Sequence, residues 1–295
     1  MAADVIVFAN QKGGVGKTIS ISATASILTQ AGQRVLMINL DAQRNLDMVA
    51  GEGVAISRRD SDSKNIMTLL HGECTVQEAI VHTEIGDIIR ATNLLYSWSG
   101  LPIISREEFE QNRDNPSVVM ELLEKRFSEK DKMDVHLLEY KLQEVMDDYD
   151  YILIDTNPTL TLLNLNGLYA AQYVVIPAFS EKSSAEAVLE LYESISSIKY
   201  YNPGRHLEIA GILMTKFDPR SRAGKRHIIK YGSIAKRTGT YLFDTKIRAS
   251  ARAAEYVEAG KDIVRYDPTG NTTQDYITFV DELLERIRTI KEAWN

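Results

Sequence analysis

Short apolar runs bounded by turn residues recur along the chain, and most of them do not alternate with polar positions. Such runs indicate strands buried on both faces of a sheet. Helical periodicity between them predicts an α/β fold, a doubly wound, mostly parallel sheet flanked by helices. The expected strands are Val5–Ala9, Val35–Leu40, Asp87–Ala91, Tyr151–Ile154, Tyr173–Pro177, Ile209–Met214 and Tyr241–Phe243. The expected helices are Lys17–Ala31, Leu137–Met146, Leu160–Ala171, Ser184–Tyr200 and Asp275–Trp294.

Two segments interrupt this alternation and are expected to be insertions in a single domain that spans residues 1–295. Residues 52–65 are polar and lack periodicity, and residues 100–135 are rich in charge. Both features are typical of solvated surface elaborations, and a partner-binding role for the second segment is the alternative.

The chain has one cysteine, Cys74, and no long apolar run. One cysteine excludes an internal disulfide and a CxxC metal or iron–sulfur site, and it favours the reducing cytoplasm. A membrane-spanning helix needs about 18–20 apolar residues in succession, which no run in the sequence approaches. We therefore expect a cytoplasmic protein.

Charge is distributed unevenly along the chain. The net charge is −7, yet the segment 216–252 holds eleven lysines and arginines against two aspartates. That segment alone carries +9, which leaves −16 for the rest of the chain. A local positive excess of this kind suits binding to phosphate backbones, even in an acidic protein.

A glycine-rich run, Asn-Gln-Lys-Gly-Gly-Val-Gly-Lys-Thr at residues 10–18, lies between the first expected strand and the first expected helix. Such a loop binds nucleotide phosphates at a helix N-terminus. Lys17 is expected to reach the β- and γ-phosphates, and the Thr18 hydroxyl to hold Mg²⁺. The flanking strand and helix disfavour the alternative, a chance glycine-rich turn. The glycines that permit the turn are Gly13, Gly14 and Gly16.

Two aspartates follow expected strands. Asp41 comes directly after the second strand, where a carboxylate faces the ligand crevice, so we expect it to orient the water that attacks the γ-phosphate or to accept its proton. Asp155 ends an apolar strand in the manner of a Walker-B aspartate. The expected metal site comprises Thr18, Asp41 and Asp155. The alternatives are a helix N-cap for Asp41 and a strand-end turn for Asp155.

Together these elements resemble the ParA/MinD group of deviant-Walker P-loop ATPases, whose loop reads Lys-Gly-Gly-Val-Gly-Lys-Thr. The resemblance covers most of the chain, and its later motifs are similar to the ParA/Soj branch of DNA-partitioning ATPases. It implies the P-loop NTPase fold, ATP and Mg²⁺ as cofactors, and slow intrinsic ATP hydrolysis. The motifs that carry it are Asp41-Ala42-Gln43, Leu162–Leu168, Ile212–Arg220, Thr245–Arg248, Glu255-Tyr256 and Tyr266–Pro268.

The resemblance also assigns residues to the nucleotide site. In that family the first loop lysine reaches across a dimer to the partner's nucleotide, so Lys12 would act in trans on the developing γ-phosphate charge. ATP then holds the homodimer together and hydrolysis releases it. The alternative for Lys12 is a solvated lysine in the loop. The expected catalytic residues are Lys12, Lys17 and Asp41. The residues implied in cofactor binding are Gly13, Gly14, Val15, Gly16, Lys17, Thr18, Ile19, Thr215, Asp267 and Pro268.

Four positions depart from the pattern. Gln11 stands where the strict P-loop has glycine, and Ile19 where the family has a second threonine. Asn157 replaces a common proline, and Asn39 replaces a common aspartate near the metal or switch. None of these changes removes a residue assigned to the γ-phosphate or to Mg²⁺. The hydrolysis rate is expected to depend on how an amide at position 39, in place of a carboxylate, changes the geometry near the metal or switch.

Two nucleotide bases fit the sequence. The run 215–218, Thr-Lys-Phe-Asp, fits the pattern with which many GTPases bind guanine, and signal-recognition-particle GTPases carry it on a related fold. Their Asp-Thr-Ala-Gly switch is absent, because Asn157 and Pro158 follow Asp155-Thr156. Lys12 also favours the ATPase branch. We therefore expect ATP, with Tyr266–Pro268 as the adenine-side wall by resemblance.

The basic segment after Asp218 is the candidate DNA interface, and a helix is expected to run to Arg237. Its cations can neutralise phosphates without contacting bases, which gives salt-sensitive binding that tolerates any sequence. Arg248 and Arg252, four residues apart, are expected to extend the patch along one helix face. A solvated basic helix is the alternative. The candidate residues are Arg220, Arg222, Lys225, Arg226, Lys230, Arg248 and Arg252.

The resemblance implies non-specific DNA binding by the ATP-bound dimer, nucleoid association and a ParB-like centromere-binding partner. No helix-turn-helix domain is expected before the first strand. The rival hypothesis is a MinD-like switch that acts on a protein or membrane partner. MinD-like proteins attach through a basic amphipathic C-terminal helix, whereas residues 276, 280, 283, 284, 287 and 290 form one apolar stripe with mixed charges elsewhere. That pattern suits core packing, so no membrane partner is expected.

Overall fold

The computed structural model describes residues 2–51, 64–95, 135–159, 161–179, 181–250 and 252–294. The insertions expected at 52–65 and 100–135 lie outside these residues, apart from Lys64, Asn65 and Val135. The expected start of a helix at Leu160 also lies outside them.

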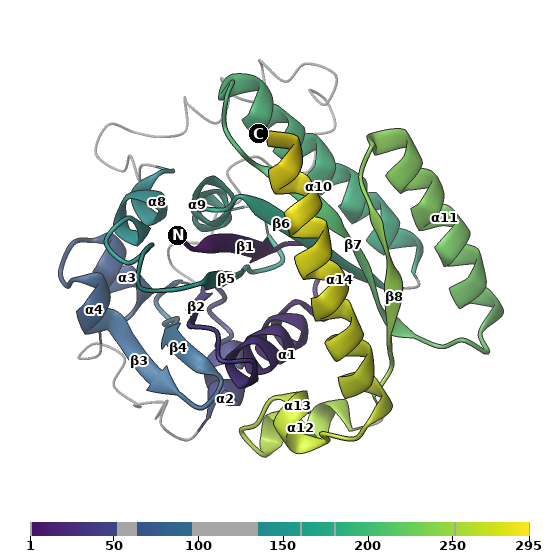
Figure 1. Cartoon of the computed structure of the whole chain (residues 1–295), viewed down its shortest axis with the longest axis horizontal. Helices are drawn as coiled ribbons and strands as arrows, with labels where there is room; N and C mark the ends of the chain where they lie inside the picture. Colours follow the sequence, from purple (N-terminus) through teal and green to yellow (C-terminus); the bar gives the residue numbers. More distant parts are fainter. Residues whose placement is uncertain are drawn as a thin grey trace.

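An eight-stranded sheet forms the centre of the molecule, in the order β3-β4-β2-β5-β1-β6-β7-β8 (Figure 1). All neighbouring strands pair in parallel except β3 and β4, which are antiparallel. The mostly parallel sheet confirms the predicted fold class. The strands are β1 (Asp4–Phe8), β2 (Val35–Asn39), β3 (Ile80–Thr83), β4 (Gly86–Ile89), β5 (Tyr151–Asp155), β6 (Tyr173–Phe179), β7 (Glu208–Phe217) and β8 (Leu242–Arg248).

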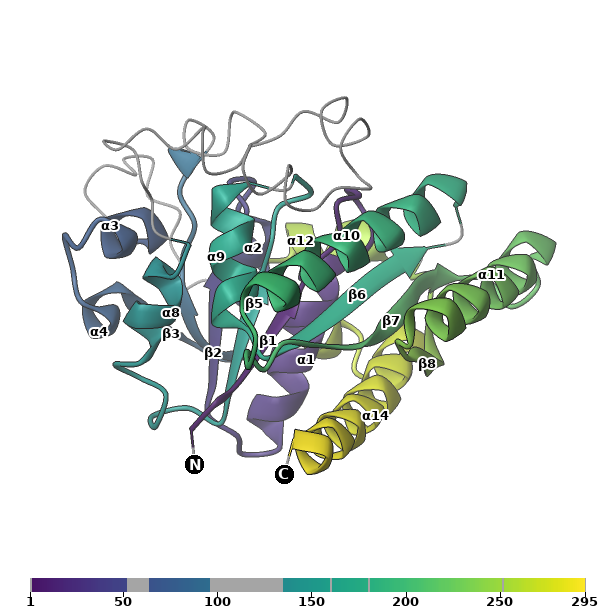
Figure 2. The ribbon, with the colours of Figure 1, turned by 90° about the horizontal axis from the view of Figure 1, so that it is seen from above.

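Helices cover both faces of the sheet, as the unalternating strands predict (Figure 2). Along β1, Val5 and Val7 point into one core, which α3, α8, α9, α10 and α11 complete, and Ile6 and Phe8 point into the other, with α1 and α14. The helices are α1 (Lys17–Gln30), α2 (Asn45–Ala50), α3 (Ile66–Leu70), α4 (Val76–Ala79), α8 (Leu137–Leu142), α9 (Leu162–Ala170), α10 (Lys182–Tyr201), α11 (Arg222–Thr238), α12 (Ala253–Glu258), α13 (Ile263–Tyr266) and α14 (Asn271–Trp294).

Three sequence predictions need correction. Strand β3 was not expected, because it is short and only partly buried, which leaves no apolar run. The helix expected at Leu137–Met146 ends at Leu142, and turns follow it. The short strand expected at Tyr241–Phe243 continues as β8 to Arg248, where charged positions on a half-exposed edge strand hide the pattern.

The apolar stripe of the last helix packs into the core, as predicted. Tyr276, Val280, Leu283 and Ile287 of α14 are buried against α1 and the sheet. Among the described helices, none is both long enough and apolar enough to cross a membrane.

The carboxyl ends of the central strands bring three distant segments together. Asp155, the last residue of β5, is in register with Phe8 at the end of β1 on one side and with Asn39 at the end of β2 on the other. The glycine-rich loop follows β1 and the Asp41 segment follows β2, so both lie beside Asp155 at one edge of the sheet.

Candidate functional site

The loop at residues 10–18 turns tightly from β1 into α1. Gly14 and Gly16 have φ values of 72° and 90°, the left-handed region that favours glycine. Gly16 is the N-cap of α1, so the loop ends where the first backbone N–H groups of a helix are free to bind an anion. The tight turn that the sequence predicts is therefore present, and phosphate binding by it stays a prediction.

Lys17 is buried inside this loop, with only 7% of its surface exposed. Its Nζ donates to the backbone oxygens of Asn10 (3.3 Å) and Lys12 (3.5 Å). Burial lowers the pKa of Lys17, while the carboxylates of Asp155 and Asp41 act in the opposite direction. An additional negative charge at this place would stabilise the ammonium form.

Thr18 and Asp155 make direct contact. The Thr18 hydroxyl donates to Asp155 Oδ2 at 2.8 Å, while the buried Asp155 Oδ1 has no hydrogen-bond partner among the described residues. Burial raises the pKa of Asp155 to about 7, against the opposing effects of Lys17 and the Thr18 hydrogen bond. A carboxylate and a hydroxyl are the hard oxygen ligands that Mg²⁺ prefers, and an unpaired buried carboxylate oxygen fits a cation there.

The described side chains offer few further ligands for a metal ion beside Thr18 and Asp155. Within the described part of the chain, no three or more His, Cys, Asp or Glu side chains gather into a metal-binding group. Mg²⁺ is commonly held by one or two carboxylates together with phosphate oxygens and water, and Thr18 with Asp155 suits that arrangement. Asp155 is the last residue of β5 and contacts Thr18, which argues against a simple turn role.

Asp41 lies in the segment after β2 and is half-buried. Its Oδ1 accepts from the Gln43 backbone N–H, and its own N–H donates to Asn39 Oδ1, both at 2.9 Å. Burial raises the pKa of Asp41, while the Gln43 N–H and Lys17 lower it. Asp41 is not the N-cap of α2, because Arg44 holds that position. The helix-cap alternative is therefore wrong.

Lys12 lies at the start of the loop and binds within its own chain. Its Nζ is 2.9 Å from Glu181 Oε2 and 5.8 Å from the centre of the Phe179 ring. Lys216 approaches the same ring at 5.5 Å. The Lys12 and Glu181 side chains are 29% and 51% exposed, so water competes with this ion pair.

The residues implied in binding the nucleotide base occupy two places. Thr215 is buried against the glycine-rich loop, and its hydroxyl donates to the Val15 backbone oxygen at 2.7 Å. Asp267 and Pro268 precede α14, which is tied to α1 through the Ser20 and Tyr276 hydroxyl groups at 3.1 Å. Contact of these residues with a nucleotide remains a proposal.

Five of the seven candidate DNA-binding residues are grouped on α11 and just before it. All five are exposed, and among the residues that the structure describes none of them forms an ion pair. Their helix lies at the outer margin of the molecule (Figure 2). We call this set the α11 basic surface: Arg220, Arg222, Lys225, Arg226 and Lys230.

The other two candidates do not extend this surface along a helix face. Arg248 ends strand β8 and Arg252 is the N-cap of α12, so the prediction of one shared helix face is wrong. The Arg248 guanidinium binds both carboxylate oxygens of Asp275, at 2.9 and 2.7 Å. Arg252 lies 3.7 Å from Asp267.

Several residues at the site were given no role from the sequence. Asn10 joins the loop to β6, since its amide donates to the Pro177 oxygen (2.7 Å) and its Oδ1 accepts from the Lys12 N–H (2.9 Å). Glu181 lies far from the loop along the chain, and only the order of strands brings it to Lys12. Ile229, on α11, is 74% exposed among the basic residues.

Comparison with known proteins gives consistent matches. The family model described as AAA domain matches residues 3–209. The chromosome partitioning protein ParA of Myxococcus xanthus is 30% identical over 96% of this chain and 88% of its own. The sporulation initiation inhibitor protein Soj of Bacillus subtilis is 28% identical over 95% of this chain and 97% of its own.

Solved structures share the fold along nearly the whole chain. A putative plasmid partition protein of Borrelia burgdorferi bound to AMPPNP has a TM-score of 0.69 at 23% identity, covering 97% and 99% of the two chains. Cobyrinic acid a,c-diamide synthase of Mycobacterium smegmatis with an ATP analogue and magnesium scores 0.70 at 22% identity over 97% and 96%. Cyanothece McdA scores 0.71 at 17% over 96% and 99%.

Proposed function

The chain belongs to the ParA/Soj family of AAA-domain proteins, and from this premise we propose that it is an ATP-dependent DNA-segregation ATPase. Mg-ATP drives the formation of a sandwich homodimer that binds DNA without sequence preference. Hydrolysis is slow in the dimer alone, and a ParB-like centromere-binding protein stimulates it and so resets the cycle. The protein acts in the cytoplasm on the nucleoid.

The observation that carries this proposal is the Thr18–Asp155 contact beside Lys17, at the N-terminus of α1. Backbone N–H groups of the loop bind the phosphates, and the Lys17 ammonium neutralises the β- and γ-phosphate oxygens. Thr18 and Asp155 would hold Mg²⁺, which supplies further positive charge to the phosphates when it is bound. ATP analogues and magnesium are bound in solved relatives of the same fold.

Asp41 is the candidate for the hydrolytic step. Its carboxylate is half-buried near Lys17, and its backbone is fixed by Asn39. Burial raises its pKa, which makes the carboxylate a better proton acceptor. We assign to it the orientation of the attacking water and the acceptance of its proton.

Lys12 is the candidate for action in trans. An ammonium from each subunit at the facing γ-phosphate would stabilise the charge that develops in the transition state. The contact with Glu181 is half-exposed, and such surface pairs contribute only about 0–1 kcal/mol. Nucleotide in a facing subunit can therefore compete with Glu181 for Lys12, which would couple ATP binding to dimerisation.

The α11 basic surface is the candidate DNA interface. Its five cations are exposed, and no carboxylate of the described chain neutralises them, in contrast to Arg248. Charges of this kind bind phosphates without contacting base edges, which is the chemistry of non-specific binding.

The alternative is a positioning switch that acts on a protein or membrane cargo without DNA. Partition proteins, McdA and an amide-forming synthase share this fold, so the fold leaves both functions open. The exposed Ile229, next to Lys230 on α11, favours protein contact there. The buried stripe of α14 speaks against attachment to a membrane through that helix.

The test is ATPase activity measured with duplex DNA, with the purified product of the neighbouring gene, and with both. The proposal predicts slow hydrolysis alone and clear stimulation by the two together. Stimulation by anionic lipid vesicles, with no response to DNA, would favour the alternative. Absence of ATP hydrolysis under every condition would contradict both functions.

A further inference from the structure

Asn39 stands where the family commonly has aspartate, and its side chain joins two parts of the site. Its Oδ1 accepts the backbone N–H of Asp41 at 2.9 Å, and its Nδ2 donates to Asp47 Oδ1 at 2.7 Å. Asn39 is completely buried at the end of β2. The amide therefore links the Asp41 backbone to the first turn of α2.

Asp47 is itself held firmly. Its carboxylate is completely buried, and it accepts from Arg44 Nε at 3.0 Å and from the Ala91 N–H at 3.4 Å. Arg44 has a φ of 60°, a conformation that side chains other than glycine rarely adopt. The buried ion pair with Asp47 offsets this backbone strain, and in turn it fixes the end of the Asp41 segment.

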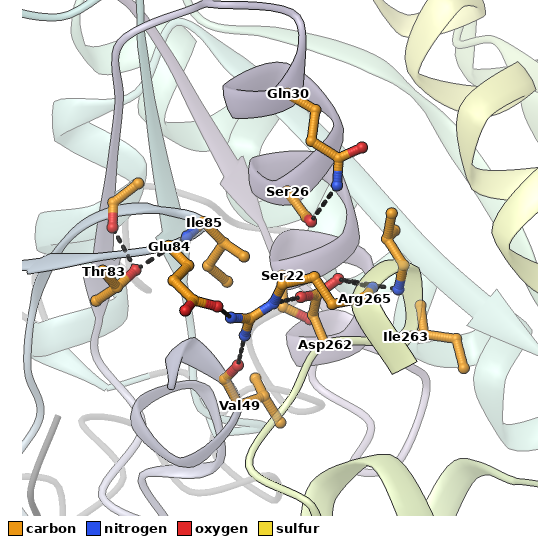
Figure 3. A network of polar contacts seen from close by, with 12 residues as sticks. Ser22, Ser26, Gln30, Val49, Thr83, Glu84, Ile85, Asp262, Ile263 and Arg265 are labelled. Atoms are coloured by element: carbon orange, nitrogen blue, oxygen red, sulfur yellow. Dashed lines mark hydrogen bonds and ion pairs between the residues drawn. The ribbon is translucent and has the colours of Figure 1, made fainter. Parts of the chain in front are cut away.

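The far end of α2 is also anchored. Arg265 of α13 donates to the Val49 backbone oxygen at 3.0 Å and pairs with Asp262 and Glu84 (Figure 3). Helix α2 is thus held at both ends, by Arg44 and Asp47 at its start and by Arg265 near its end. It is a fixed point from which Asn39 can position Asp41.

An amide at position 39 is the group that satisfies both neighbours. The Asp41 N–H needs an acceptor, whereas the Asp47 carboxylate needs a donor, and a carboxamide supplies one of each. An ionised aspartate would offer only acceptors, and it would place a second carboxylate against Asp47 in a buried site with one arginine. The choice of asparagine is therefore coupled to the presence of Asp47.

We propose that Asn39 is a positioning residue for hydrolysis, which holds Asp41 in place by bonding its backbone to the buried Arg44–Asp47 pair. The proposal rests on the hydrolytic role given to Asp41 in the proposed function. Asn39 acts through Asp41 and not on the nucleotide. Its loss is therefore expected to lower kcat and to leave nucleotide affinity nearly unchanged.

The test compares Asn39→Asp, Asp47→Asn and the double variant that exchanges the two side chains. Each single change should lower kcat at least about tenfold, with KM for ATP and Kd for a fluorescent ATP analogue within about threefold. The double variant regains one amide and one carboxylate but turns the new amide NH₂ toward the Ala91 N–H, so kcat should recover in part, to clearly above that of either single variant. Asn45→Asp, which adds the same charge outside this network, is the matched control and should keep wild-type kinetics.

A second measurement does not depend on activity. Amide hydrogen exchange of the peptide containing Asp41 should be faster in Asn39→Ala than in the wild type, because the Asn39 oxygen no longer accepts the Asp41 N–H. Exchange at the wild-type rate would overturn the proposal. Unchanged kcat in Asn39→Asp, or failure of the double variant to recover, would also overturn it. If the wild type hydrolyses no ATP, the proposed function fails, while the exchange result still tests the contact.

Discussion

Lys12 Nζ lies 2.9 Å from Glu181 Oε2 of the same chain. The lysine that we assign to the partner's nucleotide therefore forms an ion pair within its own subunit. In Glu181→Gln this competing charge is lost. Because exposed ion pairs contribute about 0.2–1 kcal/mol, we expect ATP-dependent dimerisation to strengthen by a factor of about 1.4 to 5. Analytical ultracentrifugation with Mg-ATP measures the change.

Lys12→Ala should weaken the activity that depends on the dimer, in contrast to Glu181→Gln. Nucleotide binding should persist, because Lys17 serves the phosphates within one subunit. Hydrolysis that depends on the dimer should fall at least about 100-fold, since cations supplied in trans contribute factors of about 10³–10⁵ in related chemistry. Wild-type hydrolysis in this variant would leave Lys12 as a solvated loop lysine.

Asp41→Ala separates binding from hydrolysis. The variant should bind Mg-ATP and dimerise, while single-turnover hydrolysis slows by about 10²–10⁴, the usual range for loss of a general base. Normal turnover would remove Asp41 from the role given to it. Asp41→Asn is the conservative companion, which keeps the size of the side chain and removes its basicity.

The raised pKa of Asp155 should make the stability of the nucleotide-free protein depend on pH. Its pKa is raised to about 7 by burial, above its value in the unfolded chain, so the folded state binds the proton more tightly. The free energy of unfolding should therefore fall as pH rises, by about 1.4 kcal/mol per unit between about pH 4 and 7 from this group. Urea titrations at pH 5, 6 and 7 measure it.

The matched variant for that experiment is Asp155→Asn, whose side chain does not titrate. Its unfolding free energy should fall less between pH 5 and 7 than that of the wild type. Parallel curves for the two proteins would contradict the raised pKa. Mg-ATP should flatten the wild-type curve, because bound cation favours the ionised carboxylate.

Charge reversal on the α11 basic surface should impair DNA binding without affecting ATP binding. Arg220→Glu with Arg222→Glu should weaken binding to duplex DNA about tenfold or more and reduce the salt dependence by about two phosphate contacts. ATP binding should be unchanged. Arg288→Glu with Lys291→Glu makes the same charge change on α14, and DNA affinity should be nearly unaffected there. Equal losses in both pairs would indicate a diffuse charge effect.

The sequence was sufficient for seven of the eight described strands, for the glycine-rich loop and for the buried stripe of α14, because each depends on a local pattern of residues. It missed β3, a short and partly buried edge strand of a hairpin. It also misplaced Arg248, which lies at the end of a strand and binds Asp275 instead of lying on the predicted helix face. The Lys12–Glu181 and Asn39–Asp47 contacts depend on strand order and buried side-chain pairing, which no local pattern encodes.

The central claim is that ATP gates DNA binding. The most direct measurement is retention of the full chain on duplex DNA at low salt, with Mg-ATP, with Mg-ADP and without nucleotide, using Asp41→Ala to hold the ATP state. Strong retention is expected with Mg-ATP, weak retention in the other two conditions, and loss of retention at high salt. Equal retention in all three conditions, or none with ATP, would contradict it.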